Sequence, residues 1–252
     1  MTKHYIIMSS SYSDGRRIAF DITDESLLNT QAINGIISNI RSDCDDDVPL
    51  STHFIETKDP SWESVVTYDP FFEGVECIQT LSEFSKKIKK DRVLSGLDVA
   101  NYIASKIPCT HLSLQKLVYL AYADYLCSRS ERLFEDNIYA FQYGPVVDSI
   151  FAEYKGTGDE YIDHVDDRAV SSASIKQMPA KSRILFAKNG FDKLQSIDKT
   201  IEKYGKYSAS KLVDITHRAG SPWSIAGGSK AYHQVISDDM IKKGHSVECD
   251  KE

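Results

Sequence analysis

The stretch HLSLQKLVYLAYADY, residues 111–125, carries the strongest structural signal in the sequence. Its apolar residues recur at the three- and four-residue spacing of one helical face: Leu114, Leu117, Val118, Ala121, Tyr122 and Tyr125. Helical spacing continues on both sides, in residues 97–107 after the capping box Ser95-Gly96-Leu97-Asp98, in 191–204 before Gly205, and in 209–216 after Ser208. Residues 93–252 are therefore expected to form a mostly α-helical domain.

Glycine, proline and polar turn residues mark the ends of elements in the rest of this region. Gly144 permits an unusual turn, and Pro145 suits the first turn of a new helix. Residues 156–180 are polar and turn-rich, which predicts a loop. A last short helix is expected from Ser237, followed by a loose tail from Gly244.

Residues 1–92 differ in character and predict a smaller strand-containing domain. Strands are expected at 4–8, 17–22, 52–56 and 64–68, with helices at 24–41 and 81–90. Thr23 or Asp24 would cap the first helix. The expected fold class is α+β, with an N-terminal accessory domain (residues 1–92) followed by the helical domain (residues 93–252).

Composition excludes several classes of protein. The 252 residues are 41% hydrophobic and 27% charged, as in ordinary globular proteins. No apolar run approaches the roughly 20 residues of a membrane helix, and no signal peptide is evident, so we expect a cytoplasmic protein. Five scattered cysteines argue against a disulfide framework.

The charge balance points to a protein partner. The net charge is −7, and residues 1–92 hold 16 acidic against 10 basic residues. Nucleic-acid binding needs concentrated Lys and Arg, so it is disfavoured. The acidic N-terminal part would instead attract a basic protein surface.

The sequence has no local catalytic or ligand motif. Phosphate loops, dinucleotide fingerprints, serine elbows and paired zinc histidines are all absent from it. We therefore expect no enzyme activity, no catalytic residue and no cofactor. A metal site could assemble from distant residues, but nothing local indicates one.

Five residues have two interpretations each. Gln115 and Lys116 lie beside the apolar stripe, where they would line the rim of a partner groove, or where Gln115 would satisfy nearby backbone and Lys116 would be solvated. Tyr143, His217 and Trp223 would anchor an interface or plug the core. The core role is slightly favoured for Tyr143 and Trp223, and His217 is evenly balanced.

Several ordered motifs resemble a known family. Residues 97–103 look like its opening helix, 111–121 resemble its "LQKLlY" signature, and 133–147, ending in YGPVV, resemble its second signature. Tyr204-Gly205, Leu212, Thr216-His217 and Ser221-Pro222-Trp223 follow in the family's order. This is the Panacea domain, also called SocA-like or GepA-like, and the resemblance covers about residues 95–245. Phe141 stands where the family usually has Trp.

The resemblance implies a mostly helical domain found in antitoxins of bacterial and phage toxin–antitoxin pairs, which contact a toxin encoded beside them. It implies no catalysis. The toxin-binding candidates are the family-matching positions Gln115, Lys116, Tyr143, Pro145, His217 and Trp223. Alternatives are an adaptor that delivers the toxin to a protease, a transcriptional autoregulator, or an enzyme with a site assembled from distant residues. The oligomeric state stays open, and residues 1–92 are hypothesised to add toxin specificity.

Overall fold

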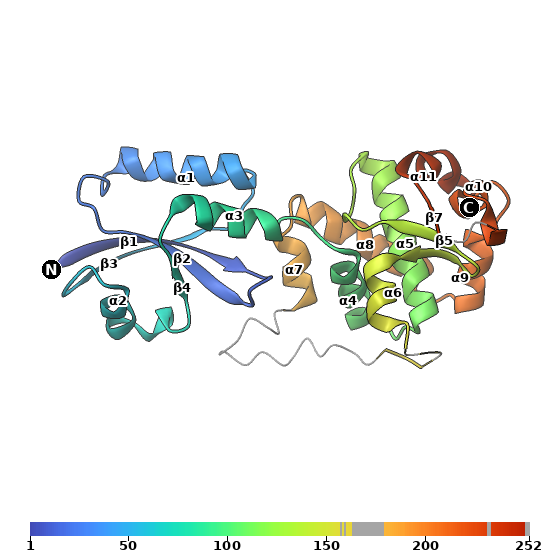
Figure 1. The fold of residues 1–252 in the computed structure, drawn as a ribbon, viewed down its shortest axis with the longest axis horizontal. Helices are drawn as coiled ribbons and strands as arrows, with labels where there is room; N and C mark the ends of the chain where they lie inside the picture. The colour runs from blue at the N-terminus through green and yellow to red at the C-terminus, as the bar shows by residue number, and fades with distance from the viewer. Residues whose placement is uncertain (157, 159, 163–178, 231–232, 250–252) are drawn as a thin grey trace. The chain divides into compact units, whose positions relative to one another are not determined.

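The computed structural model describes residues 1–156, 158, 160–162, 179–230 and 233–249. It divides into two units (Figure 1). The N-terminal unit comprises Met1–Val93 together with Phe186–Lys188. The helical unit comprises the described parts of 94–162, 180–185 and 189–249. One unit is built on a sheet and the other on helices, which confirms the expected α+β class.

The N-terminal unit is a four-stranded sheet covered by helices on both faces. Its elements are β1 (Thr2–Ser11), β2 (Arg16–Ile22), α1 (Thr30–Cys44), β3 (Ser51–Thr57), α2 (Trp62–Tyr68), the 3-10 helix η1 (Pro70–Phe72), β4 (Glu76–Ile78) and α3 (Leu81–Asp91). The strand order is β3-β1-β2-β4, with β4 parallel to β2 and the other pairs antiparallel. Figure 1 shows α1 and α3 on one face of the sheet and α2 on the other.

Strand alternation explains the two layers of this core. Successive side chains of a strand point to opposite faces. Ile7 therefore packs in a cluster with residues of α1 and α3, and Phe186 joins this same cluster. Ile6 and Met8 belong to the cluster on the opposite face, with Val65 of α2.

Two sequence expectations for this unit are wrong. Residues 64–68 are rich in β-branched side chains, but Ser61 caps them as the helix α2, which buries Val65. The first helix begins at Thr30 and not near residue 24, because Asn29 supplies the N-cap by accepting a hydrogen bond from the Ala32 amide.

The helical unit surrounds one central helix, α5. Its elements are α4 (Gly96–Lys106), α5 (His111–Arg129), β5 (Ile138–Phe141), β6 (Gly144–Val147), α6 (Asp148–Tyr154), α7 (Ala180–Phe186), α8 (Gly190–Tyr204), α9 (Ala209–Thr216), α10 (Pro222–Ile225), the 3-10 helix η3 (Gly228–Lys230), β7 (Gln234–Val235), α11 (Asp238–Gly244) and the 3-10 helix η4 (His245–Val247). Helix α5 packs against α4, α8, α9, α11 and β6, so it is buried on nearly all sides and not on one stripe alone. None of the described helices is long and apolar enough to cross a membrane.

The described part of this unit also contains a small sheet that the sequence did not predict. Its order is β6-β5-β7, with both pairs antiparallel. Gly144 and Pro145 begin strand β6, whereas a helix was expected to begin at Pro145, and that helix (α6) begins only at Asp148. Phe191, expected on the buried face of α8, is exposed. The expected loop over 156–180 lies largely outside the described residues.

The capping predictions for the helical unit are confirmed, unlike the one for the first helix of the N-terminal unit. Ser95 forms its capping box, and Ser208 and Ser237 cap α9 and α11. The tail beyond Gly244 is not loose as far as it is described: it forms η4, in which His245 is buried, and Glu248 just after it is buried as well.

Candidate functional site

Two neighbouring residues of α5, Gln115 and Lys116, form hydrogen bonds with the main chain of the β5–β6 hairpin. The Gln115 side-chain amide pairs with both main-chain groups of Val147: Oε1 accepts from the amide at 2.8 Å, and Nε2 donates to the carbonyl at 3.3 Å. An edge strand is thereby fixed to the core helix by a glutamine that is itself buried. Of the two interpretations of Gln115, satisfaction of backbone groups is the one that the structure shows.

Lys116 is fully buried, contrary to the expectation of a solvated side chain. Its Nζ donates to the Pro145 carbonyl at 2.8 Å. Burial lowers the pKa of the amine to about 7. The side chain also fills the space beside Gly144, whose φ of +104° belongs to the region that favours glycine. A Cβ at Gly144 would lie 2.9 Å from Lys116 Cε.

His217 and Trp223 form a second support. Their rings stack with centroids 3.7 Å apart and an interplanar angle of 3°. Trp223 is buried, and its Nε1 donates to the Phe141 carbonyl at 2.8 Å. Burial of His217, followed by the nearby Lys116 charge, lowers its pKa, while the Tyr143 backbone acts in the opposite direction. Trp223 thus has the core role that the sequence favoured.

Tyr143 differs from the other candidates because its side chain is 62% exposed. It lies between β5 and β6, at the tip of the hairpin, and the core role favoured from the sequence is wrong for it. Its neighbour Pro145 is buried in β6. The structure therefore brings the six candidates together around one hairpin. The side chains of Gln115, Lys116 and Trp223 bind main-chain groups of this hairpin. His217 stacks on Trp223, and Tyr143 is presented outward.

Comparison with known proteins addresses this same segment. Residues 114–224 match the family model described as "Antitoxin SocA-like, Panacea domain". This segment, a little under half of the chain, is similar to a SocA-like Panacea domain. The chain is also 26% identical to Antitoxin SocA of Caulobacter vibrioides (strain NA1000 / CB15N) over 157 residues, which is 60% of this chain and 79% of that protein. No solved structure matches the chain significantly.

The matched segment is shorter than the resemblance suggested, since it begins at Leu114 and ends at Ser224. It includes all six candidate residues. The N-terminal unit up to Val93 lies outside the match.

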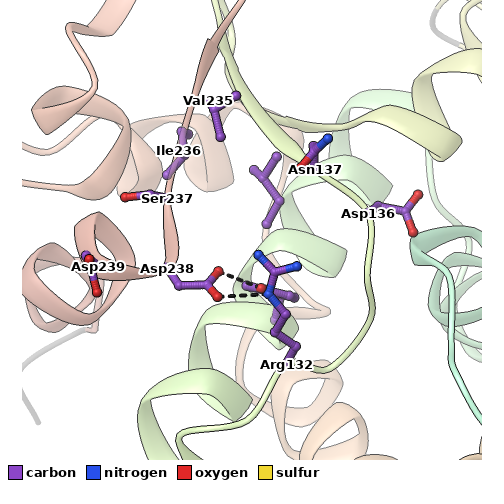
Figure 2. Close-up of a pocket in the computed structure, with 10 residues that line it drawn as sticks. Arg132, Asp136, Asn137, Val235, Ile236, Ser237, Asp238 and Asp239 are labelled. Carbon is purple, nitrogen blue, oxygen red and sulfur yellow. Dashed lines mark hydrogen bonds and ion pairs between the residues drawn. The ribbon is translucent and has the colours of Figure 1, made fainter.

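A cavity of about 370 Å³ lies in the helical unit, lined in part by residues outside the matched segment (Figure 2). Arg132 and Asp238 face each other there, with Nε 2.8 Å from Oδ2, and Tyr122 donates to the other carboxylate oxygen at 2.7 Å. Burial raises the pKa of Asp238, but the hydrogen bonds from Arg132 and Tyr122 outweigh it and lower the pKa. Asp136 and Asp239 add further acidic groups to the walls, so the cavity suits a polar or cationic group.

A polar network that sequence reasoning missed ties the C-terminal segment to α5. His245 Nε2 lies 2.8 Å from Asp124 Oδ1, and its Nδ1 lies 2.7 Å from Glu248 Oε2. Tyr119 donates to both Glu248 oxygens at 3.1 Å. Burial lowers the pKa of His245, but the hydrogen bonds with Asp124 and Glu248 outweigh it and raise the pKa to about 10. No local signal could have shown this network, because His245 and Asp124 are 121 residues apart.

Proposed function

We propose that this protein is the antitoxin of a toxin–antitoxin pair. It would neutralise its cognate toxin by direct protein–protein binding, in the cytoplasm and without catalysing a reaction. The observation that carries the proposal is the Panacea match over residues 114–224, since this segment contains the complete hairpin assembly. The similarity to a protein named Antitoxin SocA supports it.

The hairpin is the surface best suited to contact the toxin. Three of the matched side chains, Gln115, Lys116 and Trp223, hydrogen-bond to its main chain, and they fix its shape before binding. A rigid surface loses little conformational entropy when it binds. Tyr143 projects from this support, and exposed tyrosines are frequent anchors of interfaces because they add contact area with few rotatable bonds. We therefore place Tyr143 in the contact and the buried candidates behind it.

Co-expression with the protein encoded by the adjacent gene tests the proposal. Growth is followed with that protein alone, with the pair, and with the pair carrying Tyr143→Ala. We expect toxicity that the wild type relieves, together with a stable complex on co-purification. Truncation of an anchor residue costs about 2 kcal/mol or more, so Tyr143→Ala should weaken the complex about 30-fold or more.

Phe191→Ala is the matched control, since it removes an aromatic side chain that is 71% exposed on α8, in the same unit. It should leave rescue and affinity unchanged. Equal effects of the two variants would contradict the placement of the contact at the hairpin. Rescue without a stable complex, accompanied by loss of the toxin, would contradict neutralisation by binding and indicate delivery to a protease. Absence of toxicity in an expressed neighbour would overturn the antitoxin proposal.

A further inference from the structure

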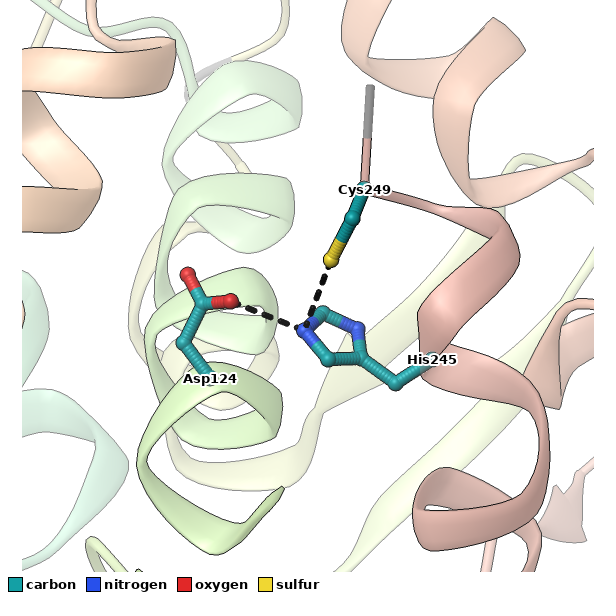
Figure 3. A group of neighbouring side chains, drawn as sticks. All are labelled: Asp124, His245 and Cys249. Atoms are coloured by element: carbon teal, nitrogen blue, oxygen red, sulfur yellow. Dashed lines mark hydrogen bonds and ion pairs between the residues drawn. The ribbon is translucent and has the colours of Figure 1, made fainter. Parts of the chain in front are cut away.

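Three metal-binding atoms of different chemistry converge beside the C-terminal segment. Figure 3 shows Asp124 on α5 facing His245 and Cys249. The imidazole Nε2 lies 2.8 Å from the Asp124 carboxylate and 3.8 Å from the Cys249 thiol, and all three donor atoms lie within 4.8 Å of one another. This cluster belongs neither to the hairpin nor to the cavity described above.

Neighbouring residues orient two of these donors, His245 and Asp124, by hydrogen bonds of the kind that usually orient metal ligands. A metal-binding histidine generally donates its other ring N–H to a carboxylate, which fixes the ring and makes it more basic. Here His245 Nδ1 lies 2.7 Å from Glu248, and Tyr119 in turn donates to Glu248. Thr200 donates to the second oxygen of Asp124 at 3.1 Å, so the first oxygen stays directed at Nε2.

We propose that Asp124, His245 and Cys249 form a zinc site. One nitrogen, one oxygen and one sulfur donor make the mixed set that zinc accepts, whereas calcium and magnesium take oxygen donors. An ionised aspartate and a thiolate together supply two negative charges, which balance a divalent cation. Zinc would replace the protons on Nε2 and on the thiol.

The spacing of the donors fits a tetrahedral ion after small movements. Zinc–ligand bonds of about 2.0–2.3 Å place nitrogen, oxygen and sulfur donors about 3.3–3.6 Å apart. The carboxylate and imidazole would separate by about half an ångström from 2.8 Å, and the thiol would move inward from 3.8 Å. Asp124 and Cys249 are both partly exposed, so the ion can enter from solvent, and water can take the fourth position.

A bound ion would fasten the end of the chain to the core helix. His245 and Cys249 lie just after α11, whereas Asp124 belongs to α5. This role goes beyond the proposed toxin binding and does not depend on it, because the ligands are distant from the hairpin in sequence and share no residue with it.

The test uses the full-length chain without a polyhistidine tag. The protein is stripped with a chelator and then titrated with Zn²⁺ against a chromophoric chelator, and separately with Co²⁺. We expect one equivalent of zinc, a rise in the melting temperature, and a thiolate-to-cobalt charge-transfer band in the near ultraviolet. Glu248→Gln should weaken zinc binding about 10–100-fold, as loss of an outer partner of a metal ligand usually does.

Cys249→Ser decides the identity of the thiolate. It should abolish the charge-transfer band and weaken zinc binding at least as much as Glu248→Gln. Cys77→Ser is the matched control, because it removes a half-buried thiol from the other unit, and it should change neither. Less than one equivalent of zinc with no cobalt band, or a band that persists in Cys249→Ser, would overturn the proposal.

Discussion

The buried amine of Lys116 makes the stability of the helical unit depend on pH in a defined direction. Burial moves its pKa from 10.5 to about 7 in the folded chain. Between these values the unfolded chain binds a proton that the folded chain has lost. Because the unfolded state then binds more protons, the free energy of unfolding rises with pH. Integration from pH 7 to pH 9 gives a gain of about 2 kcal/mol from this one group.

Lys116→Met removes the titrating group and keeps a long, flexible side chain. The variant should lack this gain, so its stability relative to the wild type should fall by about 2 kcal/mol between pH 7 and pH 9. Titrating groups distant from Lys116 behave alike in both proteins and cancel in the difference. His111 and His217 sense the Lys116 charge, but their lowered pKa values place their titration below this pH range. At pH 7 the variant should be about as stable as the wild type, because the removed cost of desolvating the amine offsets the lost hydrogen bond to the Pro145 carbonyl.

Urea unfolding followed by tryptophan fluorescence measures this difference. The chain has two tryptophans, and a Trp62→Phe background leaves Trp223 as the reporter of the helical unit. Parallel pH profiles of the variant and the wild type would refute the reasoning, since they would show that the buried amine keeps its charge.

Four further changes test other features of the chain. Gly144→Ala should destabilise the helical unit by about 2–4 kcal/mol in urea unfolding, because of its positive φ and the approach to Lys116 Cε. Gly35→Ala, on a helix with open space around it, should stabilise by about 0.5–1 kcal/mol, and equal effects of the two would contradict the steric argument. Trp223→Phe should lower the free energy of unfolding by about 1–3 kcal/mol, because it leaves the Phe141 carbonyl unpaired. Since this change removes the fluorescent reporter, urea unfolding is followed by circular dichroism, and an unchanged midpoint would exclude that bond. Deletion of residues 1–92 should abolish rescue from the cognate toxin while circular dichroism retains helix, and unchanged rescue would reject their role in specificity.

Local patterns predicted the helices better than the sheet of the helical unit. The core helix α5 and its neighbours follow from apolar spacing and capping serines, which are local features. Strand β6 does not, because Gly144 and Pro145 are typical of a turn or a helix start. Proline is tolerated there since β6 lies at the edge of the sheet, where the missing N–H costs no ladder bond.

The sequence predicted which residues belong to the candidate site, but not how they are arranged or which groups they contact. The motif residues identified the six positions, yet Gln115 and Lys116 bind main-chain groups about 30 residues away. No local pattern indicates such partners. The tail was expected to be loose for the same reason, because its polar residues lack apolar spacing. The buried His245 is instead held by hydrogen bonds to two carboxylates, one of them 121 residues away in the sequence.

Phe186 has a consequence for synthesis on the ribosome. It completes the core of the N-terminal unit, although it follows Val93 by about ninety residues. At translation rates of roughly 5–20 residues per second, that interval takes about 5–20 s. During this time the nascent sheet lacks one of its large apolar side chains. Until that phenylalanine is made, the emerging N-terminal unit is a less stable species and a better target for chaperones and proteases than the finished protein.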